Sequence, residues 1–173
     1  PWDYASDAES TAGSLAQLAT AIKEVQAENP DTIVVDIGDA IQDNSAELFQ
    51  DMDPHPVPAV FNALGYDYWT VGNHEFDYGM DKLDKILGQF EGKVLGGNVY
   101  TKAGERYYAA TDVVEVDGIK LGIVGMTTPM VQEFKEDTDI FKNHELKDPV
   151  PETQAAIKEL SGNVDAIVGI MHM

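Results

Sequence analysis

Short apolar segments that alternate with amphipathic segments are the feature of this 173-residue sequence that most constrains its fold. Residues 32–37 (Thr-Ile-Val-Val-Asp-Ile) and residues 68–71 (Tyr-Trp-Thr-Val) are rich in β-branched or aromatic side chains, which is typical of strands covered on both faces. The segments before them repeat apolar residues at three- and four-residue spacing, which indicates helices. Strands and helices that alternate in this way favour crossover connections and a mainly parallel sheet.

The same alternation continues to the end of the sequence. We predict helices over residues 10–29, 57–64, 80–90 and 152–160, and strands over residues 32–37, 68–71, 93–95, 107–116, 119–126 and 165–173. Asp117-Gly118 predicts a tight antiparallel hairpin between two of these strands, and residues 131–151 are interpreted as a polar loop. The predicted fold class is an α/β sandwich with a mainly parallel sheet, in one domain over residues 1–173.

The charge of the chain excludes several kinds of partner. It carries 11 Lys and Arg against 31 Asp and Glu, a formal net charge of −20. Such a surface repels phosphate backbones and anionic lipid, so we expect no duplex nucleic-acid partner. Apolar stretches such as residues 166–171 are far shorter than the roughly 20 residues that span a bilayer, so we expect no transmembrane segment. The absence of cysteine excludes disulfides and thiolate metal ligands.

Polar side chains follow the predicted strands at the ends where open α/β sheets bind their ligands. Asp39 follows the first strand, Asn73, His74 and Asp77 follow the second, and His172 lies at the end of the last. The same strand ends also carry Asp36, Glu75, Asn98, Thr127 and Thr128. Carboxylate, amide and imidazole donors without sulfur suit divalent cations such as Mn²⁺, Fe, Co²⁺ or Zn²⁺. Taken alone, Gly38-Asp39 is equally consistent with a plain turn, and His172 with a core histidine.

The remaining histidines are interpreted as solvated loop residues. His55 lies between two prolines, and His144 lies among charged residues. Trp69 and Phe61 are interpreted as core residues.

Three segments resemble the calcineurin-like metallophosphoesterases, and among them the bacterial secreted 5′-nucleotidase and 2′,3′-cyclic-nucleotide phosphodiesterase branch. They are residues 38–42 (Gly-Asp-Ala-Ile-Gln), residues 72–79 (Gly-Asn-His-Glu-Phe-Asp-Tyr-Gly) and the strand that ends at His172. The resemblance covers nearly the whole chain, and Gly-Asn-His-Glu is its most specific part. It implies a metallophosphoesterase-type α/β sandwich that hydrolyses phosphate esters of nucleotides with the help of metal ions.

The resemblance also implies a role for each matching residue. Two divalent metal ions would bind, with Asp39 bridging them and Asn73 and His172 ligating one of them. His74 would face the phosphoryl group of the substrate, and Asp77 would orient the His74 imidazole. Two such cations can clamp phosphoryl oxygens and supply hydroxide near neutral pH, and they would reverse the local field of an acidic protein.

Two elements of the family are not found in this sequence. Family members carry an Asp-x-His pair at the end of a first strand and a Gly-His-x-His element further along the chain. Both termini look cut, so residues 1–173 are interpreted as an incomplete catalytic domain that binds metal weakly and hydrolyses phosphoesters weakly or not at all on its own. The resemblance further implies a C-terminal substrate-recognition domain in the parent protein, and export to the periplasm or the cell surface.

Other functions compete with this interpretation. A metallophosphoesterase-like domain without activity would serve as a scaffold or binding domain. An acidic structural protein with incidental Ca²⁺ affinity is disfavoured because the carboxylates lack EF-hand spacing. A nucleotide-binding oxidoreductase is disfavoured because no Gly-x-Gly-x-x-Gly segment opens a helix.

Overall fold

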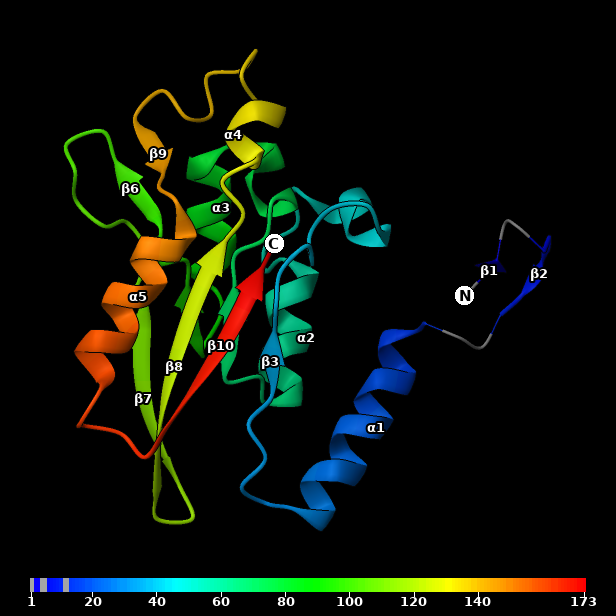
Figure 1. Ribbon diagram of the computed structural model, residues 1–173. Helices are drawn as coiled ribbons and strands as arrows, with labels where there is room; N and C mark the ends of the chain where they lie inside the picture. The colour runs from blue at the N-terminus through cyan, green and yellow to red at the C-terminus, as the bar shows by residue number, and fades with distance from the viewer. Residues whose placement is uncertain (1, 4–5, 11–12) are drawn as a thin grey trace. The chain divides into compact units, whose positions relative to one another are not determined.

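The computed structural model describes residues 2–3, 6–10 and 13–173, which belong to two compact units divided between Val34 and Val35 (Figure 1). The first unit contains a short antiparallel pair, β1 (Trp2–Asp3) and β2 (Ala8–Glu9), and helix α1 (Leu15–Glu28). The predicted helix over residues 10–29 is confirmed in its central part.

A capping box explains why α1 begins at Leu15. The Ser14 side chain accepts a hydrogen bond from the Gln17 backbone N–H at 3.2 Å, and the Gln17 side chain accepts one from the Ser14 backbone N–H at 3.4 Å. Both groups satisfy backbone donors that a helix start otherwise leaves unpaired. The helix therefore begins at Leu15, later than predicted, and residues 11–12 of the prediction lie outside the described residues.

The second unit is built on two small sheets whose strands are mostly parallel. In the first, β3 (Val35–Asp36), β4 (Tyr68–Thr70) and β5 (Lys93–Leu95) pair in parallel in that order. In the second, β10 (Ala166–His172) pairs in parallel with β8 (Ile119–Thr127), which pairs antiparallel with β7 (Thr111–Val116). The predicted parallel sheet with one antiparallel hairpin is confirmed.

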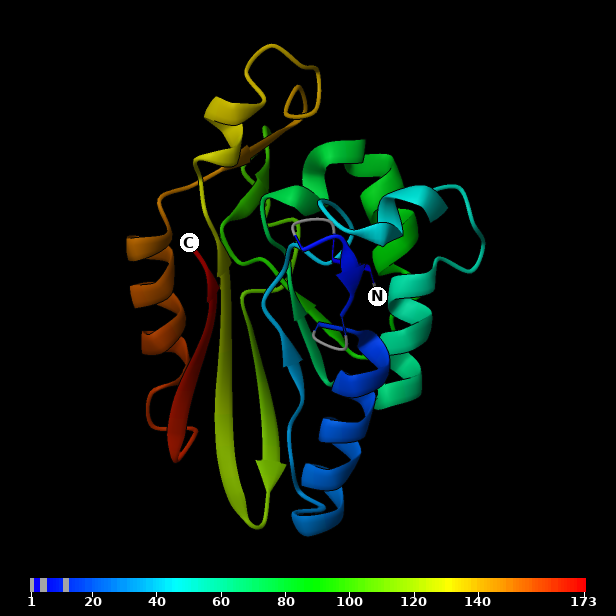
Figure 2. The same cartoon turned by 90° about the vertical axis from the view of Figure 1, so that its right-hand side faces the viewer.

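Helices cover these sheets from two sides, as Figure 2 shows, with α5 (Pro149–Leu160) on one side and α2 (Pro56–Leu64) and α3 (Met80–Leu87) on the other. Proline at the first position of α2 and of α5 fits the helix start, where its missing N–H costs nothing. The fold is thus the predicted α/β sandwich. Among the residues that the structure describes, no helix has both the length and the apolar character needed to cross a membrane.

Several short elements differ from the predictions. The expected strand over residues 32–37 reduces to β3, and the expected loop over residues 131–151 contains α4 (Val131–Phe134), β9 (His144–Leu146) and the start of α5. β9 pairs antiparallel with β6 (Val99–Thr101). Two 3₁₀ helices, η1 (Ser45–Phe49) and η2 (His74–Tyr78), complete the unit. These elements are too short to show a sequence period, and the strands depend on partners distant in sequence.

Trp69 lies at the centre of the aromatic core beneath the first sheet. Its side chain is fully buried, and its ring meets those of Phe61 and Phe90 edge-on with centroids 5.1 Å and 5.7 Å apart. The assignment of Trp69 and Phe61 to the core is confirmed. A second cluster lies between α5 and the β8 sheet and includes Val124, Met126 and Leu160. Packing on both sides holds the strands in register, and so fixes where the strand ends lie.

His55 is fully buried, so its interpretation as a solvated loop residue is wrong. It is the N-cap of α2: its Nδ1 accepts a hydrogen bond from the Val57 N–H at 3.3 Å, and its own N–H donates to the Gln89 side-chain oxygen at 2.7 Å. The flanking prolines suggested an exposed turn, but Pro56 is the first residue of the helix. Burial lowers the pKa of the His55 imidazole.

The interpretation of His144 as a solvated loop residue is also wrong. This residue begins β9 and is half-buried. Its ring packs edge-on against Tyr107 with centroids 4.5 Å apart.

Lowering the pH should therefore decrease the free energy of unfolding, because the folded protein holds His55 neutral. Its ordinary pKa is 6.5 and the folded value is lower, so the unfolded state takes up the proton first as pH falls below 6.5. The stability that neutral His55 contributes is complete above pH 6.5 and is lost below it. Urea unfolding of the wild type and His55→Asn, which keeps a capping side chain without this titration, should show a difference in unfolding free energy that shrinks from pH 7.5 to pH 5.5. A constant difference over this range would contradict the assignment.

Candidate active site

Three strand ends of the second unit meet at one edge, and each brings a predicted site residue. Asp39 follows β3, Asn73 follows β4 and His172 ends β10. The His172 Nε2 atom lies 3.0 Å from the Asn73 side-chain oxygen and 3.3 Å from an Asp39 carboxylate oxygen. The structure therefore brings together the three residues proposed as metal ligands.

The orientation of the His172 ring indicates what this group of atoms can hold. Nδ1 lies 2.7 Å from the Ile37 carbonyl oxygen, which can only accept, so Nδ1 carries a proton, and in the tautomer that can bind a metal ion Nε2 presents a lone pair. Metal-binding histidines commonly donate their other N–H in this way. Because the facing oxygens of Asn73 and Asp39 are acceptors too, three lone pairs converge on one point. A cation placed there removes their mutual repulsion.

The donor chemistry fits a divalent cation with a partial set of protein ligands. One carboxylate, one amide oxygen and one imidazole suit ions such as Mn²⁺, Fe, Co²⁺ or Zn²⁺. Within residues 2–3, 6–10 and 13–173, no three or more His, Asp or Glu side chains gather in a metal-binding cluster, and Asn73 is the third donor here.

Glu75 connects two of the loops that form this edge. Its side chain is fully buried, and one carboxylate oxygen accepts hydrogen bonds from the backbone N–H groups of Asp39 and Gly72, each at 2.7 Å. The other oxygen accepts from the Ala40 N–H at 2.7 Å. Burial raises the pKa of Glu75 to about 7, while the three N–H donors act in the opposite direction and favour the carboxylate. One side chain thus holds the loop after β3 against the loop after β4.

The backbone around Asp39 is bent to make this contact. Asp39 has a φ of +63°, in the left-handed region that non-glycine residues seldom occupy. Its side chain accepts a hydrogen bond from the His74 backbone N–H at 3.0 Å, and the preceding Gly38 N–H donates to Asp36 at 2.9 Å. These bonds hold the Asp39 carboxylate toward Asn73 and His172, which is the kind of place where proteins tolerate backbone strain.

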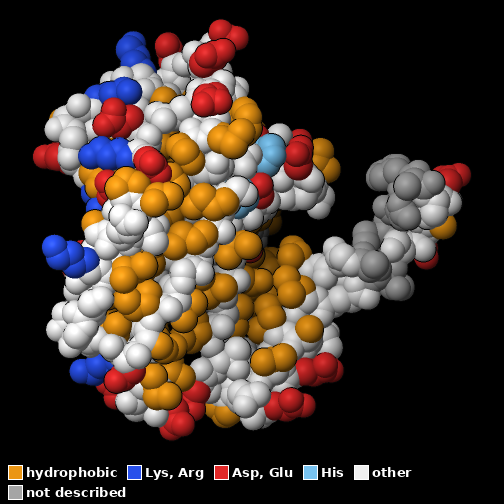
Figure 3. All heavy atoms as spheres, in the orientation of Figure 1, with side chains coloured by type: hydrophobic (Ala, Val, Ile, Leu, Met, Phe, Trp, Pro, Cys, Tyr) orange, Lys and Arg blue, Asp and Glu red, His pale blue; other side chains and the backbone are white. Residues whose placement is uncertain are grey.

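His74 and Asp77 form the predicted pair beside these ligands. The His74 Nδ1 lies 2.8 Å from an Asp77 carboxylate oxygen, and this hydrogen bond raises the pKa of His74 although burial opposes the change. The other Asp77 oxygen lies 2.7 Å from the Lys135 ammonium group. His74 Nε2 therefore points away from Asp77. The His74 side chain is 30% exposed, and Figure 3 shows histidine side chains beside carboxylates at the surface.

Not every polar residue at a strand end joins this site. The Asn98 amide is buried and bonds to the backbone of Thr127, donating to its carbonyl at 2.8 Å and accepting from its N–H at 2.9 Å. It also donates to the Lys147 carbonyl at 3.0 Å. Asn98 therefore joins the ends of β6 and β8 and is structural.

Three residues that matter here were not among the predicted site residues. Glu75 lies inside the Gly-Asn-His-Glu segment, so the sequence indicated that its position matters but did not predict its role. Lys135 lies in the expected loop over residues 131–151, and Asp43 in a polar stretch before η1. No spacing in the sequence predicts the contacts of Lys135 with Asp77 or of Asp43 with His74.

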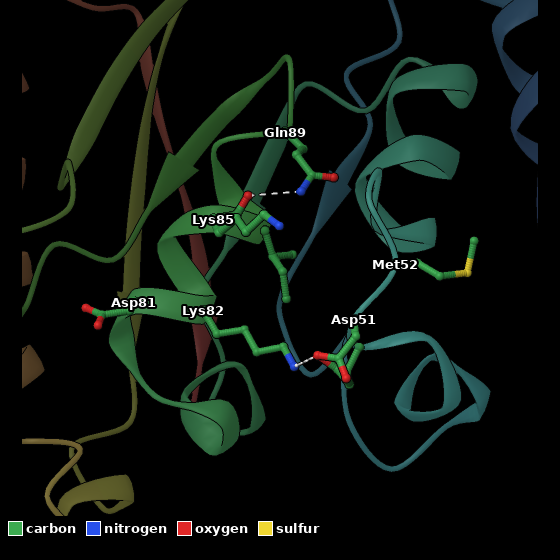
Figure 4. Close-up of a pocket in the computed structure, with 8 residues that line it drawn as sticks. Asp51, Met52, Asp81, Lys82, Lys85 and Gln89 are labelled. Carbon is green, nitrogen blue, oxygen red and sulfur yellow. Dashed lines mark hydrogen bonds and ion pairs between the residues drawn. The ribbon is translucent and has the colours of Figure 1, made fainter.

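A cavity of about 350 Å³ lies elsewhere, between α3 and the chain that follows η1. Figure 4 shows Lys82 pointing to Asp51, with the ammonium and carboxylate groups 2.9 Å apart, and Gln89 bonded to the Lys85 carbonyl at 3.1 Å. None of the predicted site residues lines this cavity.

Metal-dependent hydrolases of the α/β class keep their ligands at the ends of parallel strands and on the loops that follow them. The candidate residues Asp39, Asn73 and His172 lie at such positions in this chain. Within that class, the chain belongs to the calcineurin-like phosphoesterase family, whose model matches residues 8–172. The resemblance noted in the sequence is therefore confirmed.

Relatives with known names support the same assignment. The chain is 29% identical over 191 residues to the trifunctional nucleotide phosphoesterase protein YfkN of Bacillus subtilis (strain 168), covering 99% of this chain and 13% of the relative. It is 26% identical over 188 residues to a 2′,3′-cyclic-nucleotide 2′-phosphodiesterase/3′-nucleotidase of Haemophilus influenzae, covering 99% and 28%. It is 31% identical over 159 residues to a 5′-nucleotidase of Vibrio vulnificus, covering 87% and 27%.

The fold agrees with these relationships. The crystal structure of YfkN from Bacillus subtilis matches with a TM-score of 0.88 at 29% identity, covering 99% of this chain and 57% of that one. The chain spans 13% to 28% of the length of the three curated relatives.

Replacing Glu75 should separate the two loops that it joins. In Glu75→Gln the amide nitrogen faces backbone N–H donors that it cannot accept from, so we expect a loss of about 3 kcal/mol in unfolding free energy. The measurement is urea unfolding at pH 8, above the Glu75 pKa of about 7. Glu115→Gln, an exposed change on β7, serves as the control and should have almost no effect. Equal stability of the two variants would show that the carboxylate does not hold the loops.

Proposed function

We propose that, within its parent protein, this chain hydrolyses phosphate esters of nucleotides, as a 5′-nucleotidase or as a 2′,3′-cyclic-nucleotide phosphodiesterase, with divalent cations as cofactors. The observation that carries the proposal is the convergence of acceptor atoms from Asp39, Asn73 and His172 next to the outward-facing nitrogen of His74. The names of the relatives support the substrate class, because they include a 5′-nucleotidase and a 2′,3′-cyclic-nucleotide 2′-phosphodiesterase/3′-nucleotidase.

Asp39, Asn73 and His172 would hold a metal ion, and Asp39 is the residue that would be shared between two of them. When bound, divalent cations polarise the phosphoryl oxygens and make a bound water acidic enough to supply hydroxide. The carbonyl of Ile37 fixes the His172 ring with Nε2 toward the ligands. The Asp39 N–H is held by Glu75, so the carboxylate does not depend on the metal for its placement.

His74 would act on the phosphate ester directly. Its raised pKa favours the imidazolium, which can donate from Nε2 to a phosphoryl oxygen or give a proton to the leaving oxygen. Asp77 accepts from Nδ1 and so fixes the ring, and Lys135 neutralises the second Asp77 oxygen. The outward nitrogen is therefore the one available to a substrate.

Charge dictates the order of binding. The chain has a formal net charge of −20, and the site itself contains several carboxylates. A phosphate ester is repelled by such a field until cations reverse it locally. Cation binding should therefore precede substrate binding.

Two substitutions separate the proposed roles. In the full-length parent protein, His74→Ala should lower the Mn²⁺-dependent rate of p-nitrophenol release from bis-p-nitrophenyl phosphate by about 100-fold or more, with the metal content nearly unchanged. Asn73→Ala should instead reduce the Mn²⁺ bound per chain, measured by elemental analysis after dialysis. Asn163→Ala, an exposed asparagine outside the site, is the matched control. Equal metal loss in the first two variants would contradict this division, and hydrolysis absent from the wild type would favour a scaffold without activity.

Two further expectations stay predictions. Export to the periplasm or the cell surface is testable by cell fractionation. A substrate-recognition domain C-terminal to this chain in the parent protein is testable from the reading frame that encodes it.

A further inference from the structure

Asp43 brings a carboxylate to the atom that the proposed mechanism directs at the substrate. One Asp43 oxygen lies 3.3 Å from His74 Nε2, and the Asp43 side chain is 75% exposed. His74 is already paired through its other nitrogen with Asp77. Asp43 therefore adds a second, solvent-facing negative charge at the position that a phosphoryl group would approach.

The loop that carries Asp43 is held in a conformation that aims this side chain. Asp43 has a φ of +57°, in the left-handed region that glycine adopts most easily. The Asn44 amide donates to the carbonyl oxygens of Ala40 and Gln42 at 3.1 Å and 2.8 Å, and accepts from the Ala46 N–H at 2.8 Å. A strained backbone that the neighbouring side chain holds in place is a feature of positions with a function.

A second contact anchors the same loop to the site. The Tyr78 hydroxyl donates a hydrogen bond to the Gln42 side-chain oxygen. Tyr78 follows Asp77 directly at the end of η2. The loop before Asp43 and the element that carries His74 and Asp77 are thus joined beyond the His74–Asp43 pair.

We propose that Asp43 is a specificity-determining residue that favours phosphodiesters, which carry one negative charge, over phosphomonoesters, which carry two. The inference rests on the proposed function and narrows its substrate class. Repulsion by a fixed charge grows in proportion to the charge of the approaching group. At pH 8 a phosphomonoester is a dianion because its second pKa is about 6, whereas a diester stays a monoanion. Bound metal ions attract the dianion more strongly than the monoanion, and a nearby carboxylate such as Asp43 opposes that preference.

The preference of Asp43 for diesters over monoesters also favours release of the product. Hydrolysis of a diester forms one P–O bond from water and breaks the P–O bond to the leaving oxygen; one water proton goes to that oxygen and the other is released to solvent. The products are an alcohol and a phosphomonoester dianion. Asp43 repels that dianion more than it repels the substrate, which favours release over a second hydrolysis. A phosphodiester is therefore the substrate class that the charge of Asp43 favours.

The test compares two substrates in matched variants of the full-length parent protein. kcat/KM is measured at pH 8 with Mn²⁺ for p-nitrophenyl phosphate and for bis-p-nitrophenyl phosphate. In Asp43→Asn the ratio of the monoester value to the diester value should rise roughly five- to tenfold, and the rise should shrink as salt is added. Asp43→Gly should show the same rise, because glycine accepts the backbone conformation. Asp117→Asn removes the same charge from another left-handed aspartate, in the exposed turn between β7 and β8, and should leave the ratio unchanged.

An unchanged ratio in both Asp43 variants, with activity retained, would overturn the inference and leave the proposed function intact. If the wild type hydrolyses neither substrate, the proposed function fails, and the effect of Asp43 is then decided by binding. NMR titration of the His74 ring in the presence of Zn²⁺, a diamagnetic cation, with inorganic phosphate and with dimethyl phosphate at pH 8 gives the two affinities. Asp43→Asn should raise the affinity for inorganic phosphate roughly five- to tenfold more than that for dimethyl phosphate, and an equal change for both would overturn the inference.

Discussion

The candidate active site depends on the buried carboxylate of Glu75. Backbone N–H groups from the loop after β3 and from the loop after β4 donate to the same side chain, at 2.7 Å in each case. These bonds hold the two loops together without any metal ion, and so place Asp39 near Asn73. His172, at the end of β10, completes the group. The carboxylate that arranges the site is thus distinct from the one that would bind metal.

Two of the carboxylates around this centre have hydrogen-bond or ion-pair partners. Glu75 is surrounded by backbone donors, and Asp77 lies between His74 and Lys135. The N–H at His172 Nδ1 donates a hydrogen bond to a backbone carbonyl. The facing atoms of Asp39, Asn73 and His172 contact one another at 3.0 Å and 3.3 Å, and Asp43 adds an exposed carboxylate beside His74. A cation bound among the facing atoms of Asp39, Asn73 and His172 would offset part of this negative charge.

Sequence patterns predicted the parts of this arrangement that depend on local periodicity and topology. The apolar run at residues 68–71 and the Asp-Gly turn at residues 117–118 have strong local signals, and parallel strands place their carboxyl ends at one edge, so the meeting of Asp39, Asn73 and His172 could be expected. The burial of His55 could not, because a histidine between prolines is typical of a turn as well as of a helix start. The Lys135–Asp77 and Asp43–His74 contacts join distant segments, and their geometry depends on tertiary packing and on a left-handed backbone.

The central claim is that these strand ends form a cation site before any metal arrives. Diffraction from crystals soaked in Mn²⁺, with anomalous data collected at the manganese edge, tests it most directly. The account predicts a manganese peak within ligand distance of an Asp39 oxygen, the Asn73 amide oxygen and His172 Nε2, with the Glu75 hydrogen bonds unchanged. A peak that touches none of these three residues, or a structure in which they lie apart, would contradict it.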